Sequence, residues 1–208
     1  MKERMISCLI GYLFGCFLTA EVVAKKVAGK SSSELGVSGN PGMANIMSTL
    51  GFVPGIITLL GDILKTLLAL AVSRLLFPNA ENSILIYAGF GCAIGHDFPF
   101  WRKFKGGKGV AVTCTMVLFY HFLWGLAADL GGAAVVIITK YLCLAGPATP
   151  LIFAIGMLIE KDYEAAILSF ILTLIALKLH WPFIAGIRTH ETRKDDVIAA
   201  IRKKMKRK

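Results

Sequence analysis

Long apolar runs alternate with short polar segments along almost the whole chain. A bilayer core of about 30 Å needs roughly 20 apolar residues in a helix, and shorter runs are possible in a packed bundle. The runs do not alternate apolar and polar residues as membrane strands do. The pattern therefore predicts an all-α integral membrane protein with about seven transmembrane helices. The seven runs lie near residues 5–24, 52–77, 83–100, 110–128, 131–146, 149–160 and 165–187.

The first run resembles a removable signal peptide at its start. Lys2 and Arg4 precede the apolar residues, but no small-residue cleavage site followed by a soluble domain appears. We therefore expect this run to be retained as a membrane helix. Because there is neither an internal repeat nor a low-complexity linker, residues 1–208 are expected to form a single membrane-embedded domain.

The polar segments between the runs differ in charge. Lysine and arginine follow the first run at residues 25–30, the third at residues 102–108 and the last in a tail at residues 188–208. The remaining polar segments are acidic on balance and lie at residues 79–82, at Asp129 and at residues 160–164. Because cytoplasmic loops carry an excess of basic residues, we expect the N-terminus outside and the C-terminus in the cytoplasm.

Composition agrees with a membrane protein and adds a strong positive charge. Hydrophobic residues make up 56% of the chain and charged residues 17%, and the mean hydropathy is +0.68. The formal net charge of +10 favours anionic lipid heads or anionic substrates as partners over nucleic acid. The five cysteines form neither a C-x-x-C motif nor a Cys/His cluster, so neither a metal nor another cofactor is expected.

The basic tail at residues 188–208 has two interpretations. It places Ile198, Ile201 and Met205 at helical spacing among lysines and arginines, as in a helix that lies on an anionic leaflet. A disordered basic tail fits the same residues. In either form the tail is a candidate docking site for a soluble enzyme.

A basic, glycine-rich segment lies between the third and fourth runs, and we call residues 104–109 the glycine turn. Its sequence is Phe104-Lys105-Gly106-Gly107-Lys108-Gly109. Glycine lets backbone N–H groups approach an anion without a Cβ in the way, and the lysines add charge, so the turn is a candidate phosphate cradle. The alternative is a short cytoplasmic loop whose lysines only fix the topology.

A second polar, turn-rich segment covers residues 36–45, shortly before the second run. Ser38, Asn40 and Asn45 supply several hydrogen-bonding groups on a tightly folded backbone. Such a segment can hold a polyol phosphate. The sequence Asn40-Pro41-Gly42 is also an ordinary turn, so a connecting role fits as well.

Ionisable residues inside the apolar runs mark a further candidate site. Asp62 and Lys65 are three residues apart and share one helical face. Charges inside a membrane are costly unless they pair or face a polar cavity, so such residues are candidates for function. The alternative is an ion pair that only fixes the packing of helices.

The four histidines fall into two groups. His121 and His180 lie on apolar faces and are expected to be structural. His96 ends the third run eight residues before Phe104, either as a structural hydrogen-bonding group or as part of the site. His190 lies in the polar tail and is the better candidate for a general base.

Three stretches among these residues match a known family in order and spacing. They are Ser38-Gly39-Asn40-Pro41-Gly42 with Asn45, Asp62-Ile63-Leu64-Lys65, and Gly95-His96 with the glycine turn. Together they resemble the bacterial acyl-phosphate:glycerol-3-phosphate acyltransferases, the PlsY family. Its members are inner-membrane enzymes that transfer a fatty acyl group from acyl phosphate to the 1-hydroxyl of glycerol-3-phosphate. The resemblance implies a plasma-membrane enzyme of phospholipid biosynthesis that forms lysophosphatidic acid at the cytoplasmic face.

The resemblance also implies roles for individual residues. The catalytic candidates are His190, Ser38 and Asn45. The candidates for binding substrate phosphate are Lys108, Lys105, Asn40 and the backbone of Gly106, Gly107 and Gly109. His96, Asp62 and Lys65 are expected to support the site. The enzyme needs mainly to juxtapose two substrates, stabilise an oxyanion and move a proton, which His190 or a substrate phosphate oxygen would accept.

Six positions differ from the family pattern and leave alternatives open. They are Gly36, Ala44, Ser48, Thr66, Thr189 and Thr192, where the family has serine, threonine, arginine, glycine, histidine and asparagine. One alternative is a diverged homologue that binds a phosphorylated metabolite or lipid without acyl transfer. Another is a small transporter that uses Asp62 and Lys65 as a coupled ion path.

Overall fold

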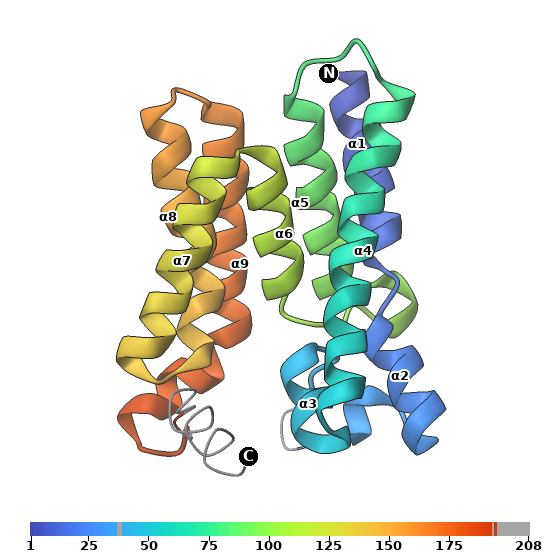
Figure 1. Ribbon diagram of the computed structural model, residues 1–208, viewed down its shortest axis with the longest axis vertical. Helices are drawn as coiled ribbons and strands as arrows, with labels where there is room; N and C mark the ends of the chain where they lie inside the picture. Colours follow the sequence, from blue (N-terminus) through green and yellow to red (C-terminus); the bar gives the residue numbers. More distant parts are fainter. Residues whose placement is uncertain (37–38, 193, 195–208) are drawn as a thin grey trace, which may run out of the picture. The chain divides into compact units, whose positions relative to one another are not determined.

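The computed structural model describes residues 1–36, 39–192 and 194, and within them the regular structure is helical. The chain forms two compact units, residues 1–120 and residues 121–208, which are described one by one (Figure 1). That residues 1–208 form one domain stays a prediction. An all-α fold is confirmed for the described residues.

Several helices of the described chain are long and apolar enough to cross a membrane. Five segments meet this condition: Lys2–Ala28, Phe52–Leu76, Phe122–Thr139, Leu142–Ile159 and Tyr163–Arg188. The apolar helices α5 (Ser83–Asp97) and α6 (Val110–Tyr120) are shorter. The chain is thus a multi-pass membrane protein by the length and composition of its helices, and the count of seven spans stays a prediction.

The first unit contains six α-helices and two short 3-10 helices within its described residues. The α-helices are α1 (Lys2–Gly15), α2 (Thr19–Ala28), α3 (Met43–Leu50), α4 (Phe52–Leu76), α5 and α6. The 3-10 helices are η1 (Ser32–Glu34) and η2 (Phe100–Arg102). Figure 1 shows α1, α4 and α5 running side by side along the length of this unit.

The closest packing in the first unit joins α1 to α5 through glycines. Gly11 and Gly15 of α1 lie against the backbone of α5, and Gly91 and Gly95 of α5 lie against the backbone of α1. A Cβ at any of these four positions would collide with a carbonyl of the other helix. Both helices therefore use glycines four residues apart, a pattern that lets membrane helices approach closely.

The predicted first helix, residues 5–24, is broken in the structure. Residues 16–18 separate α1 from α2. Backbone carbonyls at this break lack the helical hydrogen bonds that a continuous helix would provide. Side chains from distant parts of the sequence satisfy them: Lys65 donates to the carbonyls of Gly15 and Phe17, and Trp101 donates to that of Cys16. The break was not predicted because residues 13–18 around it are apolar or small.

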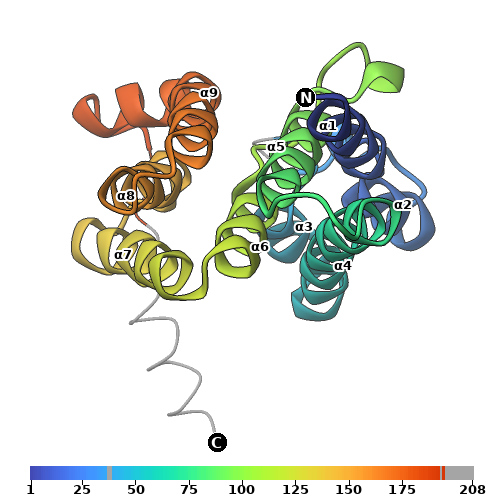
Figure 2. The ribbon, with the colours of Figure 1, turned by 90° about the horizontal axis from the view of Figure 1, so that it is seen from above.

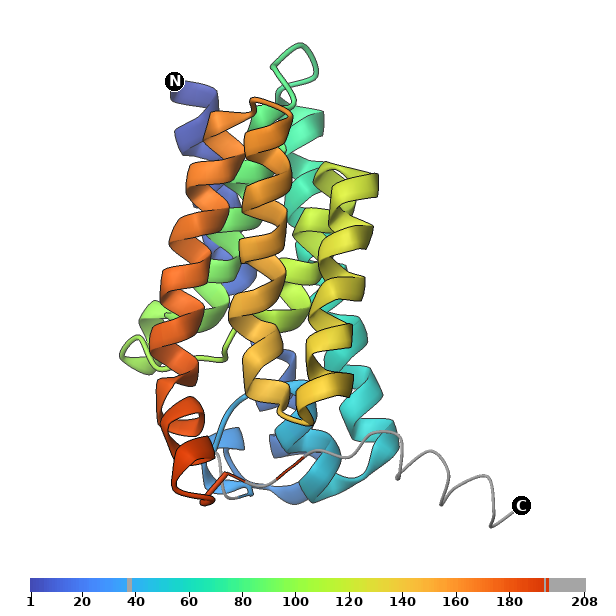
Figure 3. The same cartoon turned by 90° about the vertical axis from the view of Figure 1, so that its left-hand side faces the viewer.

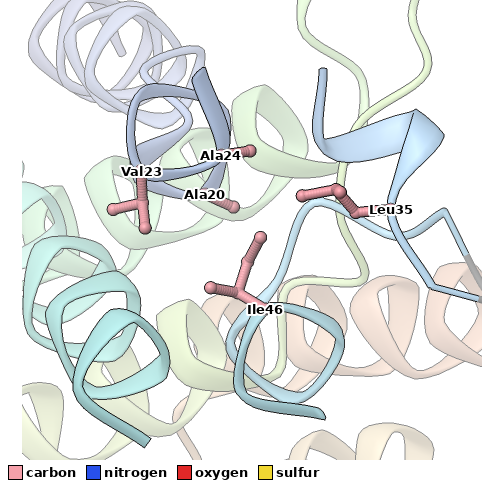
Figure 4. Close-up of a cluster of buried hydrophobic side chains, with 5 residues drawn as sticks. All are labelled: Ala20, Val23, Ala24, Leu35 and Ile46. Carbon is pink, nitrogen blue, oxygen red and sulfur yellow. The ribbon is translucent and has the colours of Figure 1, made fainter. Parts of the chain in front are cut away.

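A small apolar cluster holds the segment between α2 and α3, residues 29–42, which we call the first loop. Ala20, Val23 and Ala24 of α2 meet Leu35 of the first loop and Ile46 of α3 (Figure 4). All five side chains are buried. Burial of apolar surface therefore fixes the polar loop against α2 and α3.

The second unit contains α7 (Phe122–Thr139), the 3-10 helix η3 (Leu142–Leu144), α8 (Ala145–Ile159) and α9 (Tyr163–Arg188). Figure 3 shows the three α-helices of this unit side by side. Glycines again allow close contact: Gly156 of α8 faces the ring of Trp124, and Gly146 faces the imidazole of His180. This contact fits the expected structural role of His180.

The predicted boundaries of the fourth and fifth runs, 110–128 and 131–146, are wrong. His121 separates α6 from α7, and its Nδ1 accepts a hydrogen bond from the N–H of Trp124 (3.3 Å), which caps α7. Asp129, expected in an acidic loop, lies within α7, and Lys140, expected within the fifth run, follows the end of α7. An almost continuous apolar sequence gave little indication of this turn.

Candidate functional site

The glycine turn packs against the C-terminal end of α5. The N–H of Gly106 donates to the carbonyl of Asp97 (2.9 Å), and the N–H of Gly107 donates to the carbonyl of His96 (2.9 Å). Both carbonyls belong to the last turn of α5, where a helix has no partners of its own for them. Backbone hydrogen bonds therefore fix the position of the glycine turn.

This bonding corrects one part of the predicted phosphate cradle. The sequence predicts that the backbone of Gly106 and Gly107 faces a phosphate, but their amide hydrogens are directed at α5. A Cβ on Gly106 would collide with the carbonyl of His96, and a Cβ on Gly107 with the His96 imidazole. These two glycines are required because the turn lies so close to α5, which is a packing reason.

The remaining part of the turn leads directly into the N-terminus of α6. Gly109 has a left-handed φ of 60°, and an added Cβ would lie 2.9 Å from a carboxylate oxygen of Asp97. Because α6 begins at Val110, its first N–H groups and the positive end of its dipole lie next to Lys108. Lys108 is half-buried and Lys105 is exposed. This end of the turn is therefore the better place for a phosphate.

A buried group of charged side chains lies behind the glycine turn. The Nζ of Lys65 is 2.9 Å from Asp62 Oδ1 and 2.7 Å from His96 Nδ1. The same Nζ lies 2.9 Å from the carbonyl oxygen of Phe17 and 3.4 Å from that of Gly15. The side chains of Asp62 and Lys65 are each only 4% exposed, so water contributes little to their solvation.

Lys65 connects the three elements that meet at this point. It pairs with Asp62 on its own helix α4, it satisfies the carbonyls at the break between α1 and α2, and it contacts His96 on α5. A lysine ammonium only donates, so Nδ1 of His96 accepts. The other side of the same imidazole faces Gly107. The sequence left open whether the Asp62 and Lys65 pair belongs to the functional site or only fixes the packing of helices. These two interpretations are compatible, because the same pair fixes the helices and supports the glycine turn.

A second buried carboxylate, which the sequence did not single out, ties the first loop to η2. Glu21 Oε2 accepts hydrogen bonds from Arg102 Nη1 (2.5 Å), from Ser32 Oγ (2.6 Å) and from the Ser32 N–H (3.0 Å). The Glu21 and Arg102 side chains are 8% and 13% exposed. The available signal was an acidic residue inside the apolar run 5–24.

The residues predicted to bind the polyol lie in or beside the first loop. Ser38 lies outside the described residues. Asn40 is half-buried, and its carbonyl accepts a hydrogen bond from the N–H of Gly42 (2.8 Å). Asn45 is buried at the start of α3, and its Nδ2 donates to the carbonyl of Leu35 (2.9 Å). Asn45 thus anchors the loop, and its catalytic role stays a prediction.

Two departures from the family pattern have local explanations around Asn45. Gly36 has a left-handed φ of 64°, and an added Cβ would collide with Asn45 Oδ1. Ser48 Oγ donates to the carbonyl of Asn45 (3.0 Å) within α3. Glycine at position 36 therefore suits the side-chain position that Asn45 adopts in this chain.

His190 belongs to the second unit, where it lies exposed just after α9. It has a left-handed φ of 60°. The helix end is closed by Thr192, whose Oγ1 donates to the carbonyl of Phe183 (2.6 Å) and whose N–H donates to that of Gly186 (3.0 Å). The structure thus gives Thr192 a capping role, and the role of His190 as general base stays a prediction.

The described residues combine membrane-length apolar helices with a buried charged group and a basic turn. These features define an integral membrane protein, and phosphate binding at its basic turn stays a prediction. The chain belongs to the glycerol-3-phosphate acyltransferase family, because the family model of that description matches residues 5–190.

Individual relatives show how far this similarity extends. Glycerol-3-phosphate acyltransferase 1 of Lactobacillus acidophilus is 38% identical over 202 residues, which are 97% of each chain. Glycerol-3-phosphate acyltransferase of Francisella tularensis subsp. tularensis is 32% identical over 172 residues, 83% of each chain. The crystal structure of PlsY (YgiH), an integral membrane glycerol 3-phosphate acyltransferase, in its glycerol 3-phosphate form has a TM-score of 0.80 at 20% identity. That match covers 95% of this chain and 98% of the other, and it shows a shared fold.

Proposed function

We propose that this protein is a bacterial glycerol-3-phosphate acyltransferase that takes its acyl group from acyl phosphate. The observation that carries the proposal is the family match over residues 5–190, together with relatives named for this activity that are similar over nearly the whole chain. The basic glycine turn beside the N-terminus of α6 adds a place for a phosphate. The product is lysophosphatidic acid, a precursor of membrane phospholipids.

The reaction needs little beyond positioning and charge. The 1-hydroxyl oxygen of glycerol-3-phosphate attacks the carbonyl carbon of acyl phosphate, the bond from that carbon to the phosphate oxygen breaks, and inorganic phosphate leaves. The hydroxyl proton passes to His190 or to an oxygen of a substrate phosphate. Because phosphate is a good leaving group, juxtaposition of the substrates and stabilisation of the tetrahedral oxyanion provide most of the rate enhancement, without a covalent nucleophile.

The proposed roles of individual residues come from the family resemblance, and contacts in the first unit support the arrangement. Lys108, Lys105 and the N-terminus of α6 bind phosphate, and Ser38, Asn40 and Asn45 position the polyol. Two buried carboxylates support this arrangement from behind: Asp62 acts through Lys65 and His96, and Glu21 acts through Arg102. A rigid support matters because a displacement of the reacting groups by about 1 Å costs on the order of a hundredfold in rate.

For the membrane topology we propose seven crossings, with the N-terminus outside and the glycine turn at the cytoplasmic side. The corrected end of α7 supports this orientation, since exposed Lys140 then falls on the same side as the other basic segments. The helices α5 and α6, of 15 and 11 residues, are short, so the turn between them lies recessed toward the membrane. The tail proposed to receive a soluble acyl-phosphate-forming enzyme lies mostly outside the described residues.

The direct test is acyl transfer by the purified protein in nanodiscs. With acyl phosphate and labelled glycerol-3-phosphate, the wild type should form labelled lysophosphatidic acid, and acyl-CoA should not replace acyl phosphate. Lys108→Ala should lower kcat/KM for glycerol-3-phosphate or acyl phosphate at least about a hundredfold, because a charge-assisted phosphate contact is lost. The matched control is Lys26→Ala, an exposed lysine of α2 in the same unit, which should keep full activity. Equal activity of the two variants would contradict the assignment of Lys108.

A further inference from the structure

The segment that enters the glycine turn carries an aromatic and basic surface that acyl transfer does not require. Phe100, Trp101 and Phe104 are 56%, 48% and 61% exposed, and Lys103 between them is exposed as well. We call these four residues the aromatic anchor. We propose that the aromatic anchor binds the head-group region of anionic phospholipids.

The backbone holds these side chains outward in a conformation that is unusual for residues with a Cβ. Lys103 and Phe104 have φ values of 53° and 59°, two consecutive residues in the left-handed region. The N–H of Phe104 donates to the carbonyl of Pro99 (3.1 Å), and the N–H of Lys105 donates to that of Arg102 (3.1 Å). Such backbone conformations persist where the surrounding structure holds them, and they concentrate at functional positions.

The protein side of the anchor is firmly bonded. Trp101 Nε1 donates to the carbonyl of Cys16 at the break between α1 and α2 (2.8 Å), which leaves the ring face half exposed. The guanidinium of Arg102, which pairs with Glu21, lies 5.7 Å from the centre of the Trp101 ring. Figure 2 shows the turn after α5 projecting from the helices of the first unit. The anchor is therefore a preformed surface, and the described helices of this unit leave its aromatic side chains about half exposed.

The chemistry of this surface fits a lipid interface. Tryptophan and other aromatic rings gather where hydrocarbon meets head groups, because one part of the ring system is apolar and its N–H is polar. A neighbouring lysine adds attraction to anionic lipids that it does not have for zwitterionic ones. The anchor also follows the apolar helix α5 after only two residues, Phe98 and Pro99, so it lies at the end of a membrane segment.

The anchor would have a consequence for the reaction. Because it is continuous with the glycine turn, bound lipid would hold that turn at the leaflet from which an amphiphilic acyl phosphate arrives. This consequence rests on the proposed function, whereas lipid binding by the anchor does not.

The test uses fluorescence from Trp101 in the full chain. Trp124→Phe and Trp181→Phe leave Trp101 as the tryptophan of the chain. The protein is placed in nanodiscs of phosphatidylcholine with a small fraction of spin-labelled phosphatidylglycerol or spin-labelled phosphatidylcholine. The label is placed either near the head group or near the end of the acyl chain. We expect stronger quenching by the shallow label, and stronger quenching by phosphatidylglycerol than by phosphatidylcholine.

The variant and its control have the same backbone conformation. Lys103→Asn removes the charge while keeping a residue that tolerates a left-handed φ, and it should lower the preference for phosphatidylglycerol up to about fivefold. The control is Lys161→Asn, an exposed lysine with φ 62° between α8 and α9, which should leave the preference unchanged. Equal quenching by both lipids, stronger quenching by the deep label, or an unchanged preference in Lys103→Asn would overturn the proposal. Because quenching does not depend on turnover, an inactive enzyme would not affect this result.

Discussion

At the scale of single residues, a few buried polar side chains connect the parts of the site. Lys65 reaches an acid, an imidazole and two backbone carbonyls, so its removal leaves several groups without a partner at once. Glycines act in the opposite way, since the absence of a side chain allows the glycine turn to lie against His96. Replacement of Lys65 should therefore leave buried groups without hydrogen-bond partners, whereas replacement of a glycine should introduce a steric collision.

Replacement of Lys65 by methionine should destabilise the first unit strongly. The change leaves the Asp62 carboxylate buried without its cation, a loss of about 3–5 kcal/mol in the free energy of unfolding. The double variant Asp62→Leu/Lys65→Met should lose less than the sum of the two single variants, since neither charge is then left alone. Unfolding in mixed micelles measures these values, with Ser73→Ala, another buried position of α4, as the control.

Replacement of Gly107 by alanine tests the packing explanation of the glycine turn. The new Cβ would collide with the His96 ring, so the turn must move, and we expect kcat to fall at least about tenfold. Gly29→Ala is the control: its Cβ meets nothing within 4 Å, and it loses only the freedom that favours glycine at φ 67°. If both variants kept full activity, the close contact would not matter for catalysis.

His190 decides between the two acceptors of the hydroxyl proton. If the imidazole is the general base, His190→Asn should lower kcat about 10² to 10⁴-fold with little change in KM, and asparagine suits the left-handed φ. If a substrate phosphate oxygen takes the proton, the variant should keep nearly normal kcat. The neighbouring change Glu191→Gln controls for nonspecific effects on this turn.

At the scale of elements, the break between α1 and α2 is the point where the first loop, α4, α5 and η2 are tied together. The helix can break there because side chains of Lys65 and Trp101 supply the hydrogen bonds that the backbone gives up. Glu21, a turn further along α2, adds the bond to Arg102. The glycine turn is therefore held at one end by α5 and on its approach by α2.

The Glu21 and Arg102 pair should control the order of the first loop. Glu21→Gln should destabilise the fold by about 1.5–3 kcal/mol, because Arg102 and Ser32 lose a charged acceptor. Hydrogen exchange at residues 31–36 measures the effect on the loop and should increase. The exposed Glu34→Gln keeps an acceptor for the Ser31 N–H and loses only its charge, so it should have a smaller effect, limited to η1. Unchanged exchange in Glu21→Gln would mean that the apolar cluster around Ile46 suffices to hold the loop.

At the scale of the whole molecule, the chain consists of two helical units that meet in sequence between Tyr120 and His121. The glycine turn and both buried charged groups lie in the first unit, and His190 lies in the second. The proposed function requires residues of both units at one side of the membrane. The arrangement of basic segments along the chain is consistent with that requirement.

Cysteine accessibility tests this sidedness. In a background without the five native cysteines, single cysteines at Lys26 and Lys103 should react with an impermeant maleimide only after the cytoplasmic side is exposed. Cysteines at Glu81 and Lys161 should react in intact cells, because the proposed topology places these acidic segments on the opposite side. Labelling of Lys26 and Glu81 positions from the same side would contradict the proposed topology.

The sequence by itself determined that this is a helical membrane protein of the glycerol-3-phosphate acyltransferase family. Long apolar runs indicate directly that their helices lie in the membrane, and motifs of a few neighbouring residues identify the family. Tertiary structure alone decided the break after α1, the turn at His121, the Glu21 and Arg102 pair, and the direction of the Gly106 and Gly107 amides. Where the sequence around a break is apolar, the helix ends depend on hydrogen bonds from distant side chains. Here Lys65 and Trp101, 48 to 85 residues away, supply them, so local sequence does not encode the break.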